Sequence, residues 1–147
     1  MAMKLECSMS VPARLKVGEP VELRFQLRNP TASPVFVLEW HTPFEGLLAN
    51  FLRVTRNGQD VPYQGPMMKR GDPSAEEYVT LQPGASAEAK VEVSLAYDFQ
   101  QPGHYRIAFR DSLMDVVTRH AEVPRPLGRF QPLPVQCPAV ETTIVTP

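Results

Sequence analysis

The sequence of 147 residues has little of several features that would point directly to a function. Its 15 Lys+Arg and 16 Asp+Glu residues nearly cancel, and the formal net charge of -1 favours neither nucleic acid nor an anionic membrane surface. No apolar stretch approaches the roughly 18 residues that a membrane-spanning helix needs. Residues 1–11 also lack the apolar core, about 7 to 15 residues long, of a secretory signal. The sequence therefore predicts no nucleic-acid partner, no membrane span and no signal peptide within this chain.

Motifs for catalysis and for metal or phosphate binding are also missing. The three histidines are scattered: His41, His104 and His120. A zinc hydrolase would instead carry two histidines one helical turn apart with a glutamate between them. His41 and Glu45, even with Asp72 or Glu76 added, do not predict a metal site, because Pro43 disfavours a helix there. There is no Gly-x-Ser-x-Gly elbow and no glycine loop for phosphate. We therefore expect no catalytic residue, no metal and no cofactor, and a protein that is not an enzyme.

Cysteine is scarce, with only Cys7 and Cys137 near the two ends of the chain. Two single cysteines make a zinc site with paired thiolates improbable on spacing grounds. Cys7 lies in an alternating segment that turns it inward, and Cys137 shares one strand face with Leu133 and Val135. A disulfide between them is the favoured interpretation, and two buried free thiols are the alternative. A disulfide would place the protein in the periplasm or outside the cell, whereas free thiols would leave it cytoplasmic.

The dominant pattern is the period of two that is typical of half-buried strands. In residues 21–28 every odd position is apolar and every even one polar, and residues 5–11, 87–95 and 105–110 repeat this alternation. Proline is abundant, with 16 residues against 8 glycines, which disfavours long helices. The sequence predicts one domain over residues 1–147, an all-β, immunoglobulin-like antiparallel sandwich of about seven to nine strands. Residues 135–146 are expected to form its final strand.

Turn residues and two long loops separate these strands. Asn57-Gly58 predicts a hairpin, and residues 35–40 read as a central strand in which Trp40 anchors the core. Tyr105 follows the turn at residues 101–103, as in the tyrosine corner of immunoglobulin-like sandwiches, although an ordinary core tyrosine would have the same flanks. Two Pro-rich segments, residues 64–77 and 122–134, are expected to be ordered surface excursions.

Two loop stretches carry the side chains that we expect to contact a partner. These candidate residues are Thr42, Phe44, Glu45, Met67, Met68, Lys69 and Arg70. Methionines adapt to irregular surfaces, and cations can engage carboxylates. The alternative is that Met67 and Met68 plug the end of the sandwich while Lys69 and Arg70 are merely solvated.

Several blocks of the sequence resemble the N-terminal, propeptide domain of bacterial deuterolysin-type zinc metallopeptidases, a group that includes peptidyl-Lys endopeptidases. The resemblance covers roughly residues 4–112. It is carried by residues 18–30, 38–46, 63–66, 69–73 and 81–84, and is densest in the Thr-Pro-x-Glu-Gly block at 42–46 and the Tyr-x-Gly-Pro block at 63–66. In those enzymes the catalytic part carries the zinc-binding histidines, and this sequence has no such part.

The resemblance implies a non-catalytic homologue of the pro-domain that binds a secreted deuterolysin-type peptidase and inhibits it or assists its folding. Glu45 would approach the partner's metal, and Lys69 or Arg70 would enter an acidic pocket. The alternative is an immunoglobulin-like structural or assembly module of the cell envelope, which would act through an edge strand or self-association. A small-molecule binder is a third interpretation and would require a pocket.

Overall fold

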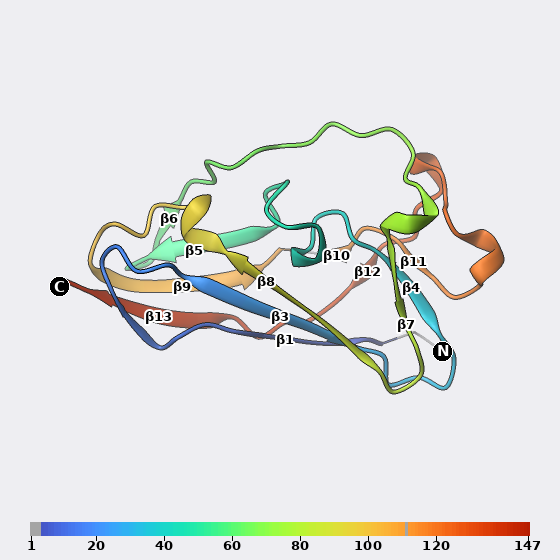
Figure 1. Ribbon diagram of the computed structural model, residues 1–147, viewed down its shortest axis with the longest axis horizontal. Coiled ribbons are helices and arrows are strands. Elements are labelled where there is room, and N and C mark those ends of the chain that lie inside the picture. The colour runs from blue at the N-terminus through green and yellow to red at the C-terminus, as the bar shows by residue number, and fades with distance from the viewer. Residues whose placement is uncertain (1–3, 111) are drawn as a thin grey trace.

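Strand β3 (Glu22–Arg28) lies at the centre of one layer of the fold, as its strict alternation predicts. It belongs to a computed structural model that describes residues 4–110 and 112–147 (Figure 1). β1 (Glu6–Ser10) and β8 (Ser86–Glu92) flank it, and both pairings are antiparallel. Leu23, Phe25 and Leu27 are fully buried, because alternate side chains of one strand point to the same face. The polar residues between them face outward.

The second layer begins with a five-stranded sheet in the order β2-β13-β9-β5-β6. Its strands are β2 (Arg14–Lys16), β5 (Leu52–Arg56), β6 (Gln59–Val61), β9 (Gly103–Phe109) and β13 (Val140–Val145). The predicted hairpin is confirmed, since β5 and β6 pair across Asn57-Gly58, whose φ angles of 50° and 85° are left-handed. β13 runs parallel to β2, so the expectation of a wholly antiparallel sandwich is wrong at this one edge.

A three-stranded sheet continues the second layer, with β4 (Val35–Leu38) between β7 (Tyr78–Leu81) and β11 (Val116–Val117). All four residues of β4 are buried, as expected for a central strand with two apolar faces. A small ribbon pairs β10 (Ser112–Leu113) with β12 (Leu133–Pro134).

The core consists of three apolar clusters that connect these sheets. One end of β3 packs with Leu23 against Tyr105 and Ile107 of the five-stranded sheet. Its other end packs with Phe25 and Leu27 against the inner face of β4. The outer face of β4 is covered by residues of the second excursion, residues 122–134. The molecule is thus an all-β, immunoglobulin-like sandwich.

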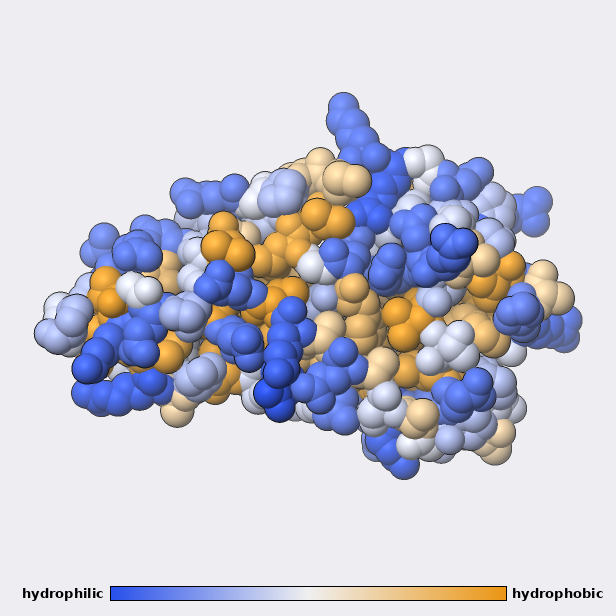
Figure 2. Space-filling model, in the orientation of Figure 1, coloured by the Kyte–Doolittle hydropathy of each residue, from blue (hydrophilic) through white to orange (hydrophobic). Residues whose placement is uncertain are grey.

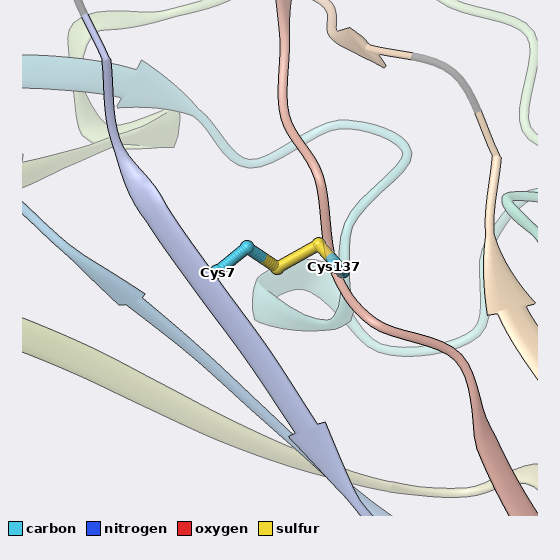
Figure 3. Close-up of a disulfide and its surroundings, with 2 residues drawn as sticks. All are labelled: Cys7 and Cys137. Carbon is cyan, nitrogen blue, oxygen red and sulfur yellow. A yellow bond between two sulfur atoms is a disulfide. The ribbon is translucent and has the colours of Figure 1, made fainter.

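A disulfide joins Cys7 on β1 to Cys137 in the segment that leads into β13 (Figure 3). The two residues are separated by 130 positions in the sequence, and their Cα atoms are 4.8 Å apart. The favoured interpretation of the two cysteines is therefore confirmed. The bond closes almost the whole chain into one covalent loop.

Strand numbers and ends differ from the sequence expectation in three ways. The described residues form thirteen strands rather than seven to nine, because five of them have only two or three residues. The alternation of 87–95 stops at Glu92, where the chain enters a 3-10 turn, and Leu95, which was expected to point inward, is 76% exposed. The final strand spans Val140–Val145 rather than 135–146, with prolines just before it.

The helical content is limited to short turns. The described residues contain no α-helix and five 3-10 turns, at Pro43–Glu45, Ala75–Glu77, Val93–Leu95, His120–Glu122 and Leu127–Arg129. None of these is long or apolar enough to cross a membrane.

The second excursion is fixed by a buried ion pair. Nη1 of Arg125 lies 2.9 Å from Oδ1 of Asp115, whose residue is fully buried. The Tyr78 hydroxyl donates to the other carboxylate oxygen at 2.6 Å, and the amide of Gln131 donates to Oδ1 at 2.9 Å. Because every oxygen of this buried carboxylate has a donor, the Pro-rich segment is ordered without regular secondary structure along most of its length.

Candidate protein-contact surface

The strap, which we define as residues 64–74, crosses one side of the sandwich between β6 and the 3-10 turn at Ala75–Glu77 (Figure 1). It contains no helix or strand, but two backbone hydrogen bonds and one side-chain hydrogen bond tie it to the body. The amide of Gln64 donates to the Ala96 carbonyl at 2.8 Å, and that of Met68 donates to the Leu48 carbonyl at 3.0 Å. Near its end, Asp72 accepts from the amide of Leu127 at 2.8 Å. The strap is therefore held at its start, middle and end.

A side-chain cluster, the Arg70 cluster, fixes the strap more strongly. It consists of Trp40, Glu45, Arg70 and Glu77. The Arg70 guanidinium lies over the Trp40 ring, forms an ion pair with Glu45, and lies 3.6 Å from Oε2 of Glu77. The Trp40 indole donates to the same Glu77 oxygen at 2.5 Å. The Arg70 and Glu45 side chains are only 14% and 3% exposed, so their attraction is weakly screened.

The Thr-Pro-x-Glu-Gly block at residues 42–46 builds the floor of this cluster. Thr42 caps the short turn by accepting from the amide of Phe44 at 3.2 Å, and Pro43 suits its first position. Gly46 ends the turn with a φ of 85°, a conformation that favours glycine. The amide of His41 donates to Oε2 of Glu45 at 2.7 Å. The Glu45 carboxylate is thereby folded back toward the chain and presented to Arg70.

Two carboxylates near the Arg70 guanidinium, those of Glu39 and Glu77, have shifted pKa values. Burial raises the pKa of Glu39, and the nearby charges of Glu45 and Glu77 raise it further. The hydrogen bond from the Trp40 indole, with help from Ser74, lowers the pKa of Glu77. Glu77 is thus favoured in the charged form that attracts Arg70.

These contacts correct the expected roles of four candidate residues. Thr42 is buried and donates to the Glu39 carbonyl, and Phe44 packs edge-on against Phe25 at a centroid distance of 5.5 Å. Glu45 and Arg70 neutralise each other. A buried, paired carboxylate does not reach a partner's metal, and a stacked, paired guanidinium does not enter a partner's pocket. Glu45 and Arg70 hold the strap, Thr42 caps the turn that carries Glu45, and Phe44 packs on β3.

The remaining three candidates are exposed. Met67 is 70% and Met68 54% exposed, and Lys69 is exposed beside them. The alternative that the methionines plug the end of the sandwich does not agree with this exposure. Figure 2, in the orientation of Figure 1, shows hydrophobic residues among the hydrophilic ones on the visible surface, including its upper part.

Leu95 is a further exposed apolar side chain, which the alternation of the sequence does not predict. It lines a groove of about 340 Å³ together with Leu47 and with Pro66 of the strap. Its side chain points outward because the alternation of β8 ends three residues earlier, which sequence periodicity alone does not reveal. We call Met67, Met68, Lys69 and Leu95 the strap surface.

The histidines lie on separate elements. His104 is 3.1 Å from Glu141 on the five-stranded sheet, and His120 packs against Phe36. Among residues 4–110 and 112–147, no group of three or more His, Cys, Asp or Glu side chains is arranged to hold a metal. Trp40 is buried in the Arg70 cluster, and the Tyr105 hydroxyl donates to the Gln101 carbonyl at 2.6 Å, the backward bond that defines a tyrosine corner.

Comparison with solved structures gives two β domains from Pyrococcus furiosus. A solution structure of a CARDB domain is 15% identical with a TM-score of 0.44, and covers 100% of both chains. A crystal structure of this domain in complex with metal ions is 14% identical with a TM-score of 0.42, and covers 99% of this chain and 96% of the other.

Comparison with known sequences finds a similarity to part of a larger protein. No family model matches the chain. An extracellular protease of Aeromonas hydrophila is 35% identical over 107 residues, which are 70% of this chain but 31% of that protein. The chain is therefore similar, over most of its length, to about a third of an extracellular protease.

Proposed function

We propose that this protein is a single-domain, non-catalytic, protease-associated module that binds an extracellular zinc peptidase of the deuterolysin type. Binding would occlude the peptidase cleft, or assist the folding of the peptidase, without any chemistry by the module itself. The observation that carries this proposal is the strap: Met67, Met68 and Lys69 are exposed at its middle, while hydrogen bonds and Arg70 hold its flanks. A surface that is ordered before binding loses little conformational entropy on docking.

Two further observations support the proposal. The similarity to part of an Aeromonas extracellular protease associates the chain with proteolysis, although it spans only 31% of that protein. The disulfide between Cys7 and Cys137 is stable in oxidising compartments and rare in the cytosol. Together they favour a periplasmic or secreted location for the module.

The strap surface has a chemistry suited to a cleft. Met67, Met68 and Leu95 offer flexible apolar contact, and Lys69 offers one cation for an acidic pocket. Burial of such exposed apolar side chains is the main source of favourable energy in association.

The experiment is a hydrolysis assay with a purified deuterolysin-type zinc peptidase and a peptide substrate. We expect the protein to slow hydrolysis, and the double variant Met67→Glu/Met68→Glu to weaken the inhibition about tenfold or more, because it places two charges in an apolar contact. Gln100→Glu/Gln101→Glu is the control, since it adds the same two charges at exposed positions outside the strap surface.

A second assay covers assisted folding. Denatured peptidase is refolded with and without the protein, and the recovered activity is measured. Undiminished hydrolysis at high micromolar protein together with an unchanged refolding yield would refute the proposal.

Association through an edge strand is the weaker alternative, as the side chains of the edge strand β8 indicate. β8 is an edge strand of its layer, and its outward positions carry Glu88, Lys90 and Glu92. Charged side chains on an edge oppose pairing with another strand.

A further inference from the structure

A second groove, the Arg110 groove, has Met67 of the strap in its wall. Its volume is about 670 Å³, within the range of ligand sites. It is lined by His41, Asn50, Phe51, Met67, Arg110, Ser112, Leu113, Met114, Phe130 and Pro132. The strap, the second excursion and the β9–β10 region thus all contribute to its walls, which are mainly apolar.

Arg110 supplies the groove with a positioned cation. Its backbone amide donates to the Phe51 carbonyl at 2.8 Å, which fixes the main chain. With the Asn50 amide oriented so that its nitrogen donates to the Leu52 carbonyl and to the Tyr97 hydroxyl, its oxygen accepts from Nη1 of Arg110 at 3.1 Å. The guanidinium is therefore held by one neutral partner, and four of its five donors are left for a ligand.

The charge at the groove is not balanced by the described residues. Within residues 4–110 and 112–147, no carboxylate lines the Arg110 groove and no ion pair of Arg110 occurs. Arg110 also borders an adjoining groove with Asp60, whose carboxylate is paired with Arg53 at 3.1 Å. Arginine forms short, charge-assisted and often bidentate hydrogen bonds with a carboxylate. The complementary ligand is therefore an apolar group that carries a carboxylate.

We propose that the Arg110 groove binds the carboxyl-terminal end of a peptide, with its terminal carboxylate on Arg110 and an apolar last side chain between the apolar walls. The groove is open to solvent, so a chain end can enter it from outside. The amide of Asn50, the hydroxyl of Ser112 and the imidazole of His41 interrupt the apolar lining and match the amide groups of a peptide. A fatty acid would leave these polar groups without partners, which carries an energetic cost.

This inference does not depend on the proposed function, because it concerns a free chain end rather than a peptidase. The probe is a fluorescein-labelled hexapeptide that ends in leucine with a free carboxylate, and binding is followed by fluorescence anisotropy. The comparison peptide is the same sequence with a carboxyl-terminal amide. Decanoate is the competitor that distinguishes a fatty acid from a peptide.

We expect saturable binding of the free-acid peptide and about tenfold or more weaker binding of the amide, as the loss of a charge-assisted hydrogen bond predicts. Arg110→Ala should cause the same loss, while Arg24→Ala should not, since Arg24 is exposed on β3 outside the groove. Both variants should keep the melting temperature of the parent.

Three results would overturn the inference. The first is no saturable binding up to about 1 mM peptide, the range of very weak complexes. The second is equal affinity for the acid and the amide, and the third is tighter binding of decanoate than of the peptide.

Discussion

The guanidinium carbon of Arg70 lies 4.7 Å from the centre of the Trp40 ring. A cation at this distance from an indole face is attracted by the ring, and more so where water is excluded. The contact joins the middle of the strap to the end of the β4 segment, and Glu45 and Glu77 complete the guanidinium's surroundings. The position of Met67, Met68 and Lys69 thus depends on Arg70, whose side chain is largely buried.

Replacement of Arg70 tests this dependence. Arg70→Ala leaves the Glu45 carboxylate buried without its cation, and we expect a loss of about 3 kcal/mol in the free energy of unfolding, the lower end for buried pairs. Urea denaturation measures the loss. Trypsin should also cut faster at Lys69, because the strap loses an attachment. Lys69→Ala is the control for stability, since Lys69 is exposed.

The double variant Glu45→Gln/Arg70→Ala separates the ion pair from simple loss of contact. It should recover part of the stability, because no charge remains unpaired at Glu45. A double variant that is less stable than Arg70→Ala would contradict the role given to the pair.

The disulfide gives a second prediction. Cys7→Ser/Cys137→Ser should lower the free energy of unfolding by about 2 to 5 kcal/mol, because the unfolded chain is no longer closed into a long loop. Urea unfolding of the oxidised parent, the reduced parent and the variant measures this. The unfolded, oxidised parent should contain no titratable thiol, and two free thiols there would refute the bridge.

Arg125 gives a third prediction through a contrast between a buried and an exposed pair. Arg125→Ala leaves the fully buried Asp115 carboxylate without its cation, and we expect a loss of about 3 to 5 kcal/mol. Arg24→Ala removes an exposed pair with Glu88 and should cost less than about 1 kcal/mol. Similar losses in the two variants would show that the ion pair between Arg125 and Asp115 does not hold the second excursion.

Local patterns account for what the sequence could predict. Alternation located β1, β3, β8 and β9, and Asn57-Gly58 located a hairpin, because each signal depends on a few neighbouring residues. The inward positions of Cys7 and Cys137 were also sufficient to predict their bond. These features are determined by the strand period and by turn geometry.

The candidate site was harder to predict, because side-chain partners come from distant segments. Glu45 and Arg70 were both singled out for a partner, yet they bind each other across the strap. The β2–β13 parallel pair joins the two ends of the chain, and no local pattern records such a contact. Leu95 was assigned inward because alternation does not show where a strand turns into a 3-10 turn.

Tyrosine titration gives the last prediction, since all four phenols are perturbed in the same direction. The residues are Tyr63, Tyr78, Tyr97 and Tyr105. Burial is the main cause that raises the pKa of each, and it raises the pKa of Tyr97 to about 12. The native state therefore favours the neutral phenols. The contribution of Tyr97 to stability is complete below the unfolded value of 10.0 and is lost as the pH rises through about 12.

Absorbance at 295 nm measures the ionised phenols directly. The native protein should show less tyrosinate at pH 10 than the urea-unfolded protein, which is about half ionised there. As the pH rises toward 12, ionisation and unfolding should occur together. The reason is that the Tyr97 hydroxyl, which donates to the Leu52 carbonyl of β5, is buried, and burial disfavours the charged phenolate. A native titration curve that coincides with the unfolded one would show that these hydroxyls are accessible to water and that the packing around Tyr97 is not as described.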